Sequence, residues 1–161
     1  MRMFSGALAV PFLVLGACKD TSCDADVPPE ITLGQGASSA FEPFEDGQDI
    51  ALTIAPQGGM GISVRALTRG VTTDNLIDLQ LITEIDGEQT GFFETNGILT
   101  CQEDGYGLLW GQVVGFNPEE FPDVDALLAL DGEQVDVIVI ATDEQDRTAE
   151  GRATVTLRVS R

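Results

Sequence analysis

Hydrophobic and polar residues alternate in short runs along most of the chain after residue 30. Apolar side chains recur at every second position in residues 31–33, 50–54, 62–66, 77–81 and 153–159. A period of two buries one face of a strand and leaves the other face in water. The runs are separated by turn-forming residues: Asp46-Gly47, Gln57-Gly58-Gly59, Arg69-Gly70, Asp86-Gly87 and Asn96-Gly97. The pattern predicts short strands of an antiparallel sheet.

Residues 108–116 depart from this simple alternation. They are apolar and are spaced by Gly107, Gly111 and Gly115, at every fourth position as on one face of a helix. Each glycine destabilises a soluble helix by about 1 kcal/mol, so we expect a bent or bulged strand instead. Residues 124–130 are our one candidate for a short helical turn.

The last part of the chain predicts a hairpin. In Gln134–Thr142, valines at alternate positions form one face, while Ile138 and Ile140 form the other, so both faces are expected to be covered. A polar loop at residues 143–151 then leads into the terminal strand. With the earlier runs this makes about seven to nine strands, and the predicted fold class is all-β, an antiparallel two-sheet β-sandwich.

The end of the chain resembles an immunoglobulin-like domain of the cadherin or fibronectin type III kind. The resemblance runs from Leu130-Asp131-Gly132 through Ala141-Thr142-Asp143 to the terminal strand. It implies a loop turn, a long buried strand and a hairpin that closes the sandwich. The chain departs from true immunoglobulin domains because Trp110 follows Cys101 instead of lying between two cysteines, and the tyrosine corner is missing.

The first 18 residues have the features of an export signal. Arg2 supplies a positive charge, an apolar run too short to span a bilayer follows, and no acid precedes Asp20. Leu15-Gly16-Ala17-Cys18 resembles the lipobox of bacterial lipoproteins. The resemblance implies a signal peptide at residues 1–17, cleavage after Ala17, and acyl chains on Cys18 that hold the protein to a membrane.

Cleavage would leave 144 of the 161 residues. We expect a tether at residues 18–29 and one β-sandwich domain at residues 30–161. Arg2 leaves with the signal, so the remaining chain has 7 of the 8 basic side chains and all 27 acidic ones, which gives a net charge of −20. Such a surface repels nucleic acid and anionic lipid, so membrane attachment must come from the acyl chains. In some bacteria an aspartate directly after the lipidated cysteine resembles a signal for retention in the inner membrane. Here that position is Lys19, which favours the outer membrane over the inner one.

The cysteines and the absence of histidine limit the chemistry that we expect of this chain. With Cys18 acylated, Cys23 and Cys101 remain as an even pair in an oxidising compartment, and we predict a disulfide between them. The chain has no histidine, which removes Ser-His-Asp and Cys-His catalysis and the commonest zinc ligand. We therefore predict no catalytic residues, no cofactor and no enzymatic activity.

Three local stretches are candidates for binding sites. Asp143, Glu144 and Asp146 could hold calcium, because cadherin-like domains use acids in comparable loops, but a solvated loop is the simpler interpretation. The other two are a proline-bounded acidic patch and a glycine-rich stretch, which we interpret as a solvated loop and a tight hairpin. They comprise Glu119, Glu120, Asp123 and Asp125, and residues 56–61.

The leading hypothesis is a non-catalytic binding or structural module of the cell envelope with an envelope protein as its partner. The alternatives are a carbohydrate- or calcium-binding envelope subunit and a periplasmic enzyme. An open concave face with Trp110, Tyr106 or Phe92 would favour ligand binding, a flat apolar patch a protein partner, and a deep pocket with converging acids an enzyme.

Overall fold

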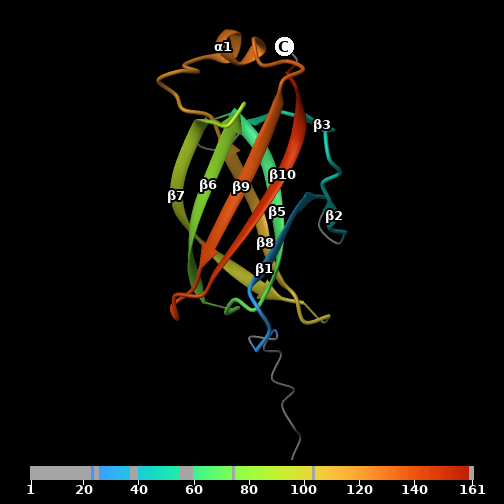
Figure 1. The fold of residues 1–161 in the computed structure, drawn as a ribbon, viewed down its shortest axis with the longest axis vertical. Helices are drawn as coiled ribbons and strands as arrows, with labels where there is room; N and C mark the ends of the chain where they lie inside the picture. Colours follow the sequence, from blue (N-terminus) through green and yellow to red (C-terminus); the bar gives the residue numbers. More distant parts are fainter. Residues whose placement is uncertain are drawn as a thin grey trace, which may run out of the picture.

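The computed structural model describes residues 23, 26–36, 40–54, 60–73, 75–102 and 104–159. These residues form β-strands and one short helix (Figure 1). In chain order the elements are β1 (Glu30–Gln35), β2 (Glu42–Pro43), β3 (Gln48–Ala51), β4 (Thr53–Ile54), β5 (Met60–Arg69), β6 (Leu76–Ile85), β7 (Glu88–Cys101), β8 (Gly107–Gly115), α1 (Val124–Leu128), β9 (Gln134–Thr142) and β10 (Thr148–Arg158).

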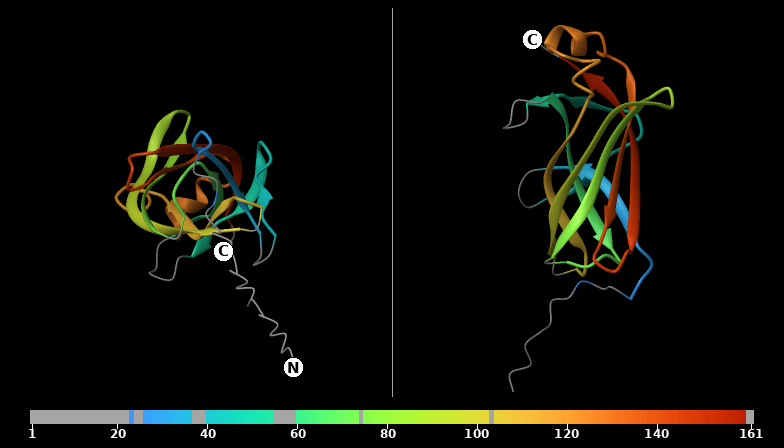
Figure 2. Two further views of the ribbon diagram at one scale, coloured as in Figure 1. Left: turned by 90° about the horizontal axis from the view of Figure 1, so that it is seen from below. Right: turned by 90° about the vertical axis from the view of Figure 1, so that its left-hand side faces the viewer.

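The strands join into one curled sheet. Among the described residues their order is β2-β1-β5-β8-β7-β6-β9-β10-β3, and β4 pairs with β5 beside this path. Every pair is antiparallel except β10 with β3, so the sheet is mixed. The sheet curls into a half-barrel, as the end-on view in Figure 2 shows. β1 approaches β10 at Gly151, where a side chain would collide with Ile31 and Leu33.

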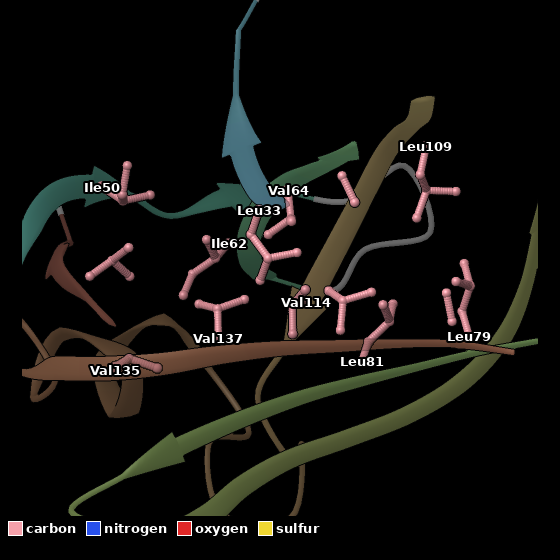
Figure 3. Packing of buried hydrophobic residues seen from close by; sticks show 14 of the residues in the cluster. Leu33, Ile50, Ile62, Val64, Leu79, Leu81, Leu109, Val114, Val135 and Val137 are labelled. Carbon is pink, nitrogen blue, oxygen red and sulfur yellow. The ribbon is translucent and has the colours of Figure 1, made fainter. Parts of the chain in front are cut away.

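The hydrophobic core fills the inside of the curl. Side chains of β5 and β8 meet those of β6 and β9 there, as Val64, Val114 and Leu81 do in Figure 3. Burying one such aliphatic side chain stabilises the fold by about 1.5–3 kcal/mol. Alternate residues of β5 and β9 are at most 1% exposed: Ile62, Val64, Ala66, Val135, Val137 and Val139. The period of two in the sequence thus marks the inner face of the sheet.

The all-β prediction is confirmed, but the sheet is not purely antiparallel. The parallel pair of β3 with β10 joins residues around Gln48 to residues around Val155, and no local pattern foretells it. β7 connects the two halves of the sheet because its first part pairs with β6 and its last three residues pair with β8. The strands are thereby continuous across the place where two separate sheets were expected.

The turn predicted at Asn96-Gly97 is wrong. Asn96 and Gly97 lie inside this strand, where they pair with Asp78 and Ile77 of β6. A Cβ atom at Gly97 would come within 2.8 Å of the methyl groups of Leu79 and Leu109, so a larger residue here would force these two side chains to shift. The loop predicted at residues 143–151 is shorter than expected, because β10 already begins at Thr148.

Other local predictions are confirmed. Asp86 and Gly87 form the turn between β6 and β7, with φ of 51° and 79°. Residues 107–115 form a strand with a bulge at Gly111, which has φ of 58°. The expected helical turn is α1, and Asp123 caps its N-terminus.

The signal peptide expected at residues 1–17, Cys18 and residues 56–59 of the glycine-rich stretch lie outside the described residues. None of the helices in the described part is long and apolar enough to cross a membrane. The first strand of the described chain begins at Glu30.

Cys23 and Cys101, the pair expected from the cysteine count, lie at disulfide-bonding distance with their Cα atoms 5.5 Å apart. Cys23 is buried, and Cys101 ends β7. The bond spans 78 positions and ties the entering chain to the end of the sheet where β7 and β8 pair.

Removing this disulfide should destabilise the fold substantially. In the chain-entropy model a loop of this length is worth about 4 to 5 kcal/mol, and distortion of the native state lowers that value. The double variant Cys23→Ser/Cys101→Ser and the reduced wild-type protein should unfold at the same lowered urea midpoint. Mass spectrometry of exported, non-reduced protein that found two free thiols would contradict the bond.

Candidate functional site

A cleft of about 790 Å³ lies between β7 and β8. Phe93–Thr95 of β7 and Gly111–Val113 of β8 line its two sides. Phe116 and Phe121 of the segment that connects β8 to α1, and Val124 of α1, close it on a third side. In Figure 1, α1 lies at the end of the molecule opposite to the one where residues 26–29 enter. The cleft thus lies towards the end of the sheet distant from residues 26–29.

The cleft opens because β7 and β8 pair over a short distance. Among the described residues their register covers Leu99 to Cys101 of β7 only. Next to this paired region β8 has its bulge, where Trp110 and Gly111 together stand opposite the single residue Arg65 of β5. The extra residue turns β8 away from β7, and the two strands separate.

The strands meet again beyond the cleft. The Asn117 amide, just after β8, donates a hydrogen bond to the Thr90 carbonyl of β7 at 2.7 Å, and the Thr83 hydroxyl of the neighbouring β6 donates to the Gly115 carbonyl of β8 at 3.2 Å. Any side chain at Gly91 would collide with the same Gly115 carbonyl. The opening between β7 and β8 is therefore bounded at both ends.

The lining of the cleft is largely apolar. The rings of Phe116 and Phe121 pack edge to face with centroids 5.5 Å apart. Phe93 and Val124 remain 38% and 41% exposed at the cleft although both are large and apolar. Phe93 stands opposite the buried Leu81 in the β6–β7 register and so lies on the inner face of the sheet. Concave apolar surfaces of this kind are the usual form of ligand sites.

The polar groups of the cleft are few, and most already have partners. The Gln112 amide donates to the Trp110 carbonyl at 3.2 Å, and the Asp123 carboxylate caps α1 by accepting from the Ala126 amide at 2.9 Å. Glu94 accepts from the Gln80 amide at 3.3 Å. Among the described residues that line the cleft, none is a lysine or an arginine. The cleft is therefore apolar with an acidic edge.

The aromatic residues singled out in the sequence lie elsewhere. The guanidinium group of Arg65 stacks 4.3 Å from the centre of the Trp110 ring, and that of Arg69 lies 4.8 Å from the Tyr106 ring. Such stacking stabilises each pair by about 0.5–1 kcal/mol and covers one face of each ring. Phe92 lies beside Phe93 on β7 but on the opposite face. Phe93, which the sequence analysis did not single out, is the aromatic residue of β7 in the cleft.

The predicted calcium candidates are held apart by the loop that contains them. Asp143 is only 5% exposed. Its Oδ1 accepts from the amides of Gln145 and Arg147 at 2.9 and 3.0 Å, and its Oδ2 accepts from the Thr72 amide at 3.0 Å and from Arg147 Nε at 2.8 Å. Glu144 and Asp146 are exposed. No group of acidic or cysteine side chains in the described chain is arranged to hold a metal ion. Asp143 therefore organises the β9–β10 turn and fastens it to the segment around Thr72.

The acidic patch at residues 119–125 does not converge on one point either. Asp123 is used as the helix cap, while Glu119 and Glu120 are exposed in the turn before it. The Glu119 backbone amide is bound by the Asn117 side chain at 3.0 Å. The patch contributes negative charge beside the cleft.

Comparisons with known proteins add no relatives to this picture. No protein-family model matches the chain, and no curated protein sequence is significantly similar to it.

Asp143→Asn should destabilise the protein by about 2–3 kcal/mol near neutral pH, because several donors around a buried carboxylate lose a charged acceptor. Burial by itself raises the pKa of Asp143, but hydrogen bonds from Thr72, Arg147 and Gln145 outweigh it and hold the pKa well below its ordinary value. The stabilisation is thus complete above the ordinary aspartate pKa and is lost as the pH falls towards the lowered one.

Urea unfolding of both proteins between pH 7 and pH 2 measures this effect. The gap in unfolding free energy should stay constant down to about pH 5 and shrink below about pH 4. Glu144→Gln, in the same loop but exposed, is the matched control and should change stability by less than about 0.5 kcal/mol. A gap that is independent of pH would contradict the assignment.

Proposed function

We propose that this protein is an exported bacterial lipoprotein that serves as a non-catalytic binding module of the cell envelope. Its leader and the lipobox-like Leu15-Gly16-Ala17-Cys18 support export and acylation at Cys18. The paired cysteines fit an oxidising compartment. On the evidence of Lys19, the outer membrane is the preferred destination.

The observation that carries the binding function is the apolar cleft between β7 and β8. Exposed aromatic and aliphatic side chains cost free energy in water, and a concave group of them gains free energy when it is covered. Gln112 and Asp123 already have partners within the protein, and the sequence offers no histidine. These features favour recognition over chemistry at this site.

The position of the cleft suits an anchored protein. Cys18 precedes Cys23 by five positions, and an extended chain of that length spans about 17 Å at most. The disulfide would therefore keep the tether end of the domain near the membrane. The cleft lies towards the other end, where α1 is found, so a partner could reach it without touching the bilayer.

The alternatives have less support. A carbohydrate platform needs free ring faces, whereas Trp110 and Tyr106 each have an arginine stacked on one face. A calcium site at residues 143–146 would have to compete with the hydrogen bonds of Asp143. We also propose a distant relation to immunoglobulin-like sandwiches, since β1, β5 and β8 face β6, β9 and β10 across a common core.

Cys18→Ser should move the protein from the membrane fraction to the soluble fraction of the cell envelope, because no other feature of the acidic chain is expected to hold a bilayer. Fractionation and immunoblotting of native cells measure the change. Ser22→Ala is the matched control, because it alters a neighbouring position that carries no acyl chain, leaves the disulfide intact and should leave the protein on the membrane. Unchanged attachment of Cys18→Ser would refute the anchor.

Binding at the cleft can be tested by site-specific photocrosslinking in intact cells. A photoreactive phenylalanine analogue in place of Val124 should give a discrete crosslinked adduct, because this side chain is exposed at the cleft. The same analogue in place of Thr32, which is exposed on β1, is the control and should give none. Equal crosslinking from both positions, or none from Val124, would contradict a binding role for the cleft.

A further inference from the structure

We propose that the cleft binds an extended, basic segment of a partner protein, which pairs with the backbones of β7 and β8 as an added strand. This inference rests on the proposed binding function and specifies its ligand. It follows from three properties of the cleft: the strand edges on its sides, the apolar inner surface, and the acidic edge.

Two strands of the described chain present unpaired edges to the cleft. Along Phe93–Thr95, β7 pairs with β6 on one side, and along Gln112–Val113, β8 pairs with β5 on one side. Within the described residues neither stretch has a strand partner on the side that faces the cleft. Backbone amide and carbonyl groups of a strand point alternately to both sides, so an unpaired side is a template for another strand. A peptide between β7 and β8 would meet such a template on both of its edges.

One side chain already substitutes for a missing strand partner. The Gln112 amide reaches back to the Trp110 carbonyl, at the place where β8 leaves β7. Backbone carbonyls inside a sheet are normally satisfied by the neighbouring strand, so this bond compensates for its absence. An incoming strand would take over this role.

The inner surface of the cleft determines which side chains the segment carries. Successive residues of a strand point to opposite faces, so every second side chain of the segment would point inwards. There it would meet Leu81, Phe93, Phe116 and Leu127. These positions of the segment should therefore be valine, leucine or phenylalanine.

The charge near the cleft determines the remaining positions. Glu94 stands opposite Gln80 on the outer face of β7, where the outward side chains of an inserted segment would lie. Glu119 and Glu120 are exposed on the segment that borders the cleft. The whole chain has a net charge of −19, and the described lining of the cleft includes no basic side chain. Lysine or arginine at the outward positions fits this field, and acidic residues are repelled by it.

The test uses a fluorescein-labelled heptapeptide in which lysine alternates with valine and phenylalanine, and the secreted, soluble Cys18→Ser protein. Fluorescence anisotropy should show saturable binding. The same peptide with N-methyl groups on alternate residues cannot donate backbone hydrogen bonds from those residues and should bind at least tenfold more weakly. A peptide with glutamate in place of lysine should also bind at least tenfold more weakly.

Two pairs of variants locate the binding. Thr95→Trp places a bulky ring at the cleft and should weaken binding at least tenfold, whereas Thr32→Trp, an exposed threonine on β1, should not. Glu94→Lys reverses a charge at the cleft and should weaken binding, whereas Glu150→Lys makes the same reversal at an exposed position of β10 and should not. Unchanged melting temperatures confirm that each variant is folded.

The outcomes separate this inference from the function on which it rests. Equal binding of the N-methylated peptide overturns strand pairing, and equal binding of the glutamate peptide overturns the charge preference. If no peptide binds while Val124 still crosslinks in cells, the ligand class is wrong and the binding function stands. If an apolar dye binds at the cleft and no peptide competes with it, the site takes a small apolar molecule and the inference also fails. If neither peptides nor crosslinks are found, the binding function itself fails.

Discussion

A sheet that curls this strongly brings parts of its own backbone close together. Glycine occupies several of these positions, because a Cβ atom there would collide with the neighbouring strand. Gly61 of β5 stands opposite Gly115 of β8, and a Cβ atom at Gly61 would collide with the Val114 carbonyl. Gly91 of β7 approaches the same region of β8 from the other side, against the Gly115 carbonyl. At Gly151, β10 makes room for Ile31 of β1. Without these approaches the inner face of the sheet could not close over its aliphatic core.

The cleft is a consequence of the same closure. β7 and β8 are held together at Leu99–Cys101 and again where Asn117 bonds to Thr90. The bulge at Gly111 adds one residue to β8 between these two points. A strand with an extra residue must bend away from its neighbour, so the sheet opens where its backbone would otherwise be paired. The connection to α1 then lies across the opening and adds Phe116 and Phe121 to its walls. Curl, bulge and cleft are therefore one structural feature.

This origin explains how much could be predicted from the sequence. Alternation revealed β5, β6, β9 and β10 because their inner positions are aliphatic and buried. The alternation did not reveal β7, because its inner positions Gly91 and Gly97 are glycines that pack closely against neighbouring residues. On the outer face of the same strand, the apolar Phe92 is exposed. Asn96-Gly97 has the composition of a turn, yet sheet pairing decides its conformation, and the Asn96 amide bonds to Asp78 at 2.6 Å.

The cleft itself could not be predicted for a related reason. It depends on which strands lie side by side and on a register shift of one residue, and neither is encoded in a local pattern. Gly111 was the only local signal, because a glycine inside an apolar strand indicates a bulge. That this bulge would open a gap beside β7 could not be predicted, because the sequence does not show that β7 is the neighbour of β8. Asp143, a candidate chosen for its residue type, accepts hydrogen bonds from Thr72, Gln145 and Arg147 within the fold.

The distribution of charge links the proposed anchor to the proposed cleft. Arg147, Arg152 and Arg158 are bound in salt bridges to acids of the same domain, with nitrogen–oxygen distances of 2.7 to 2.9 Å. Arg65 and Arg69 lie over aromatic rings. Most of the cationic groups are thus engaged within the molecule, and the excess of acids dominates the field around it. Such a field opposes adsorption to an anionic bilayer, so the proposed membrane attachment would rely on the acyl chains at Cys18. In our proposal the same field attracts a basic partner, and the apolar cleft is the surface on which that partner also buries hydrophobic side chains.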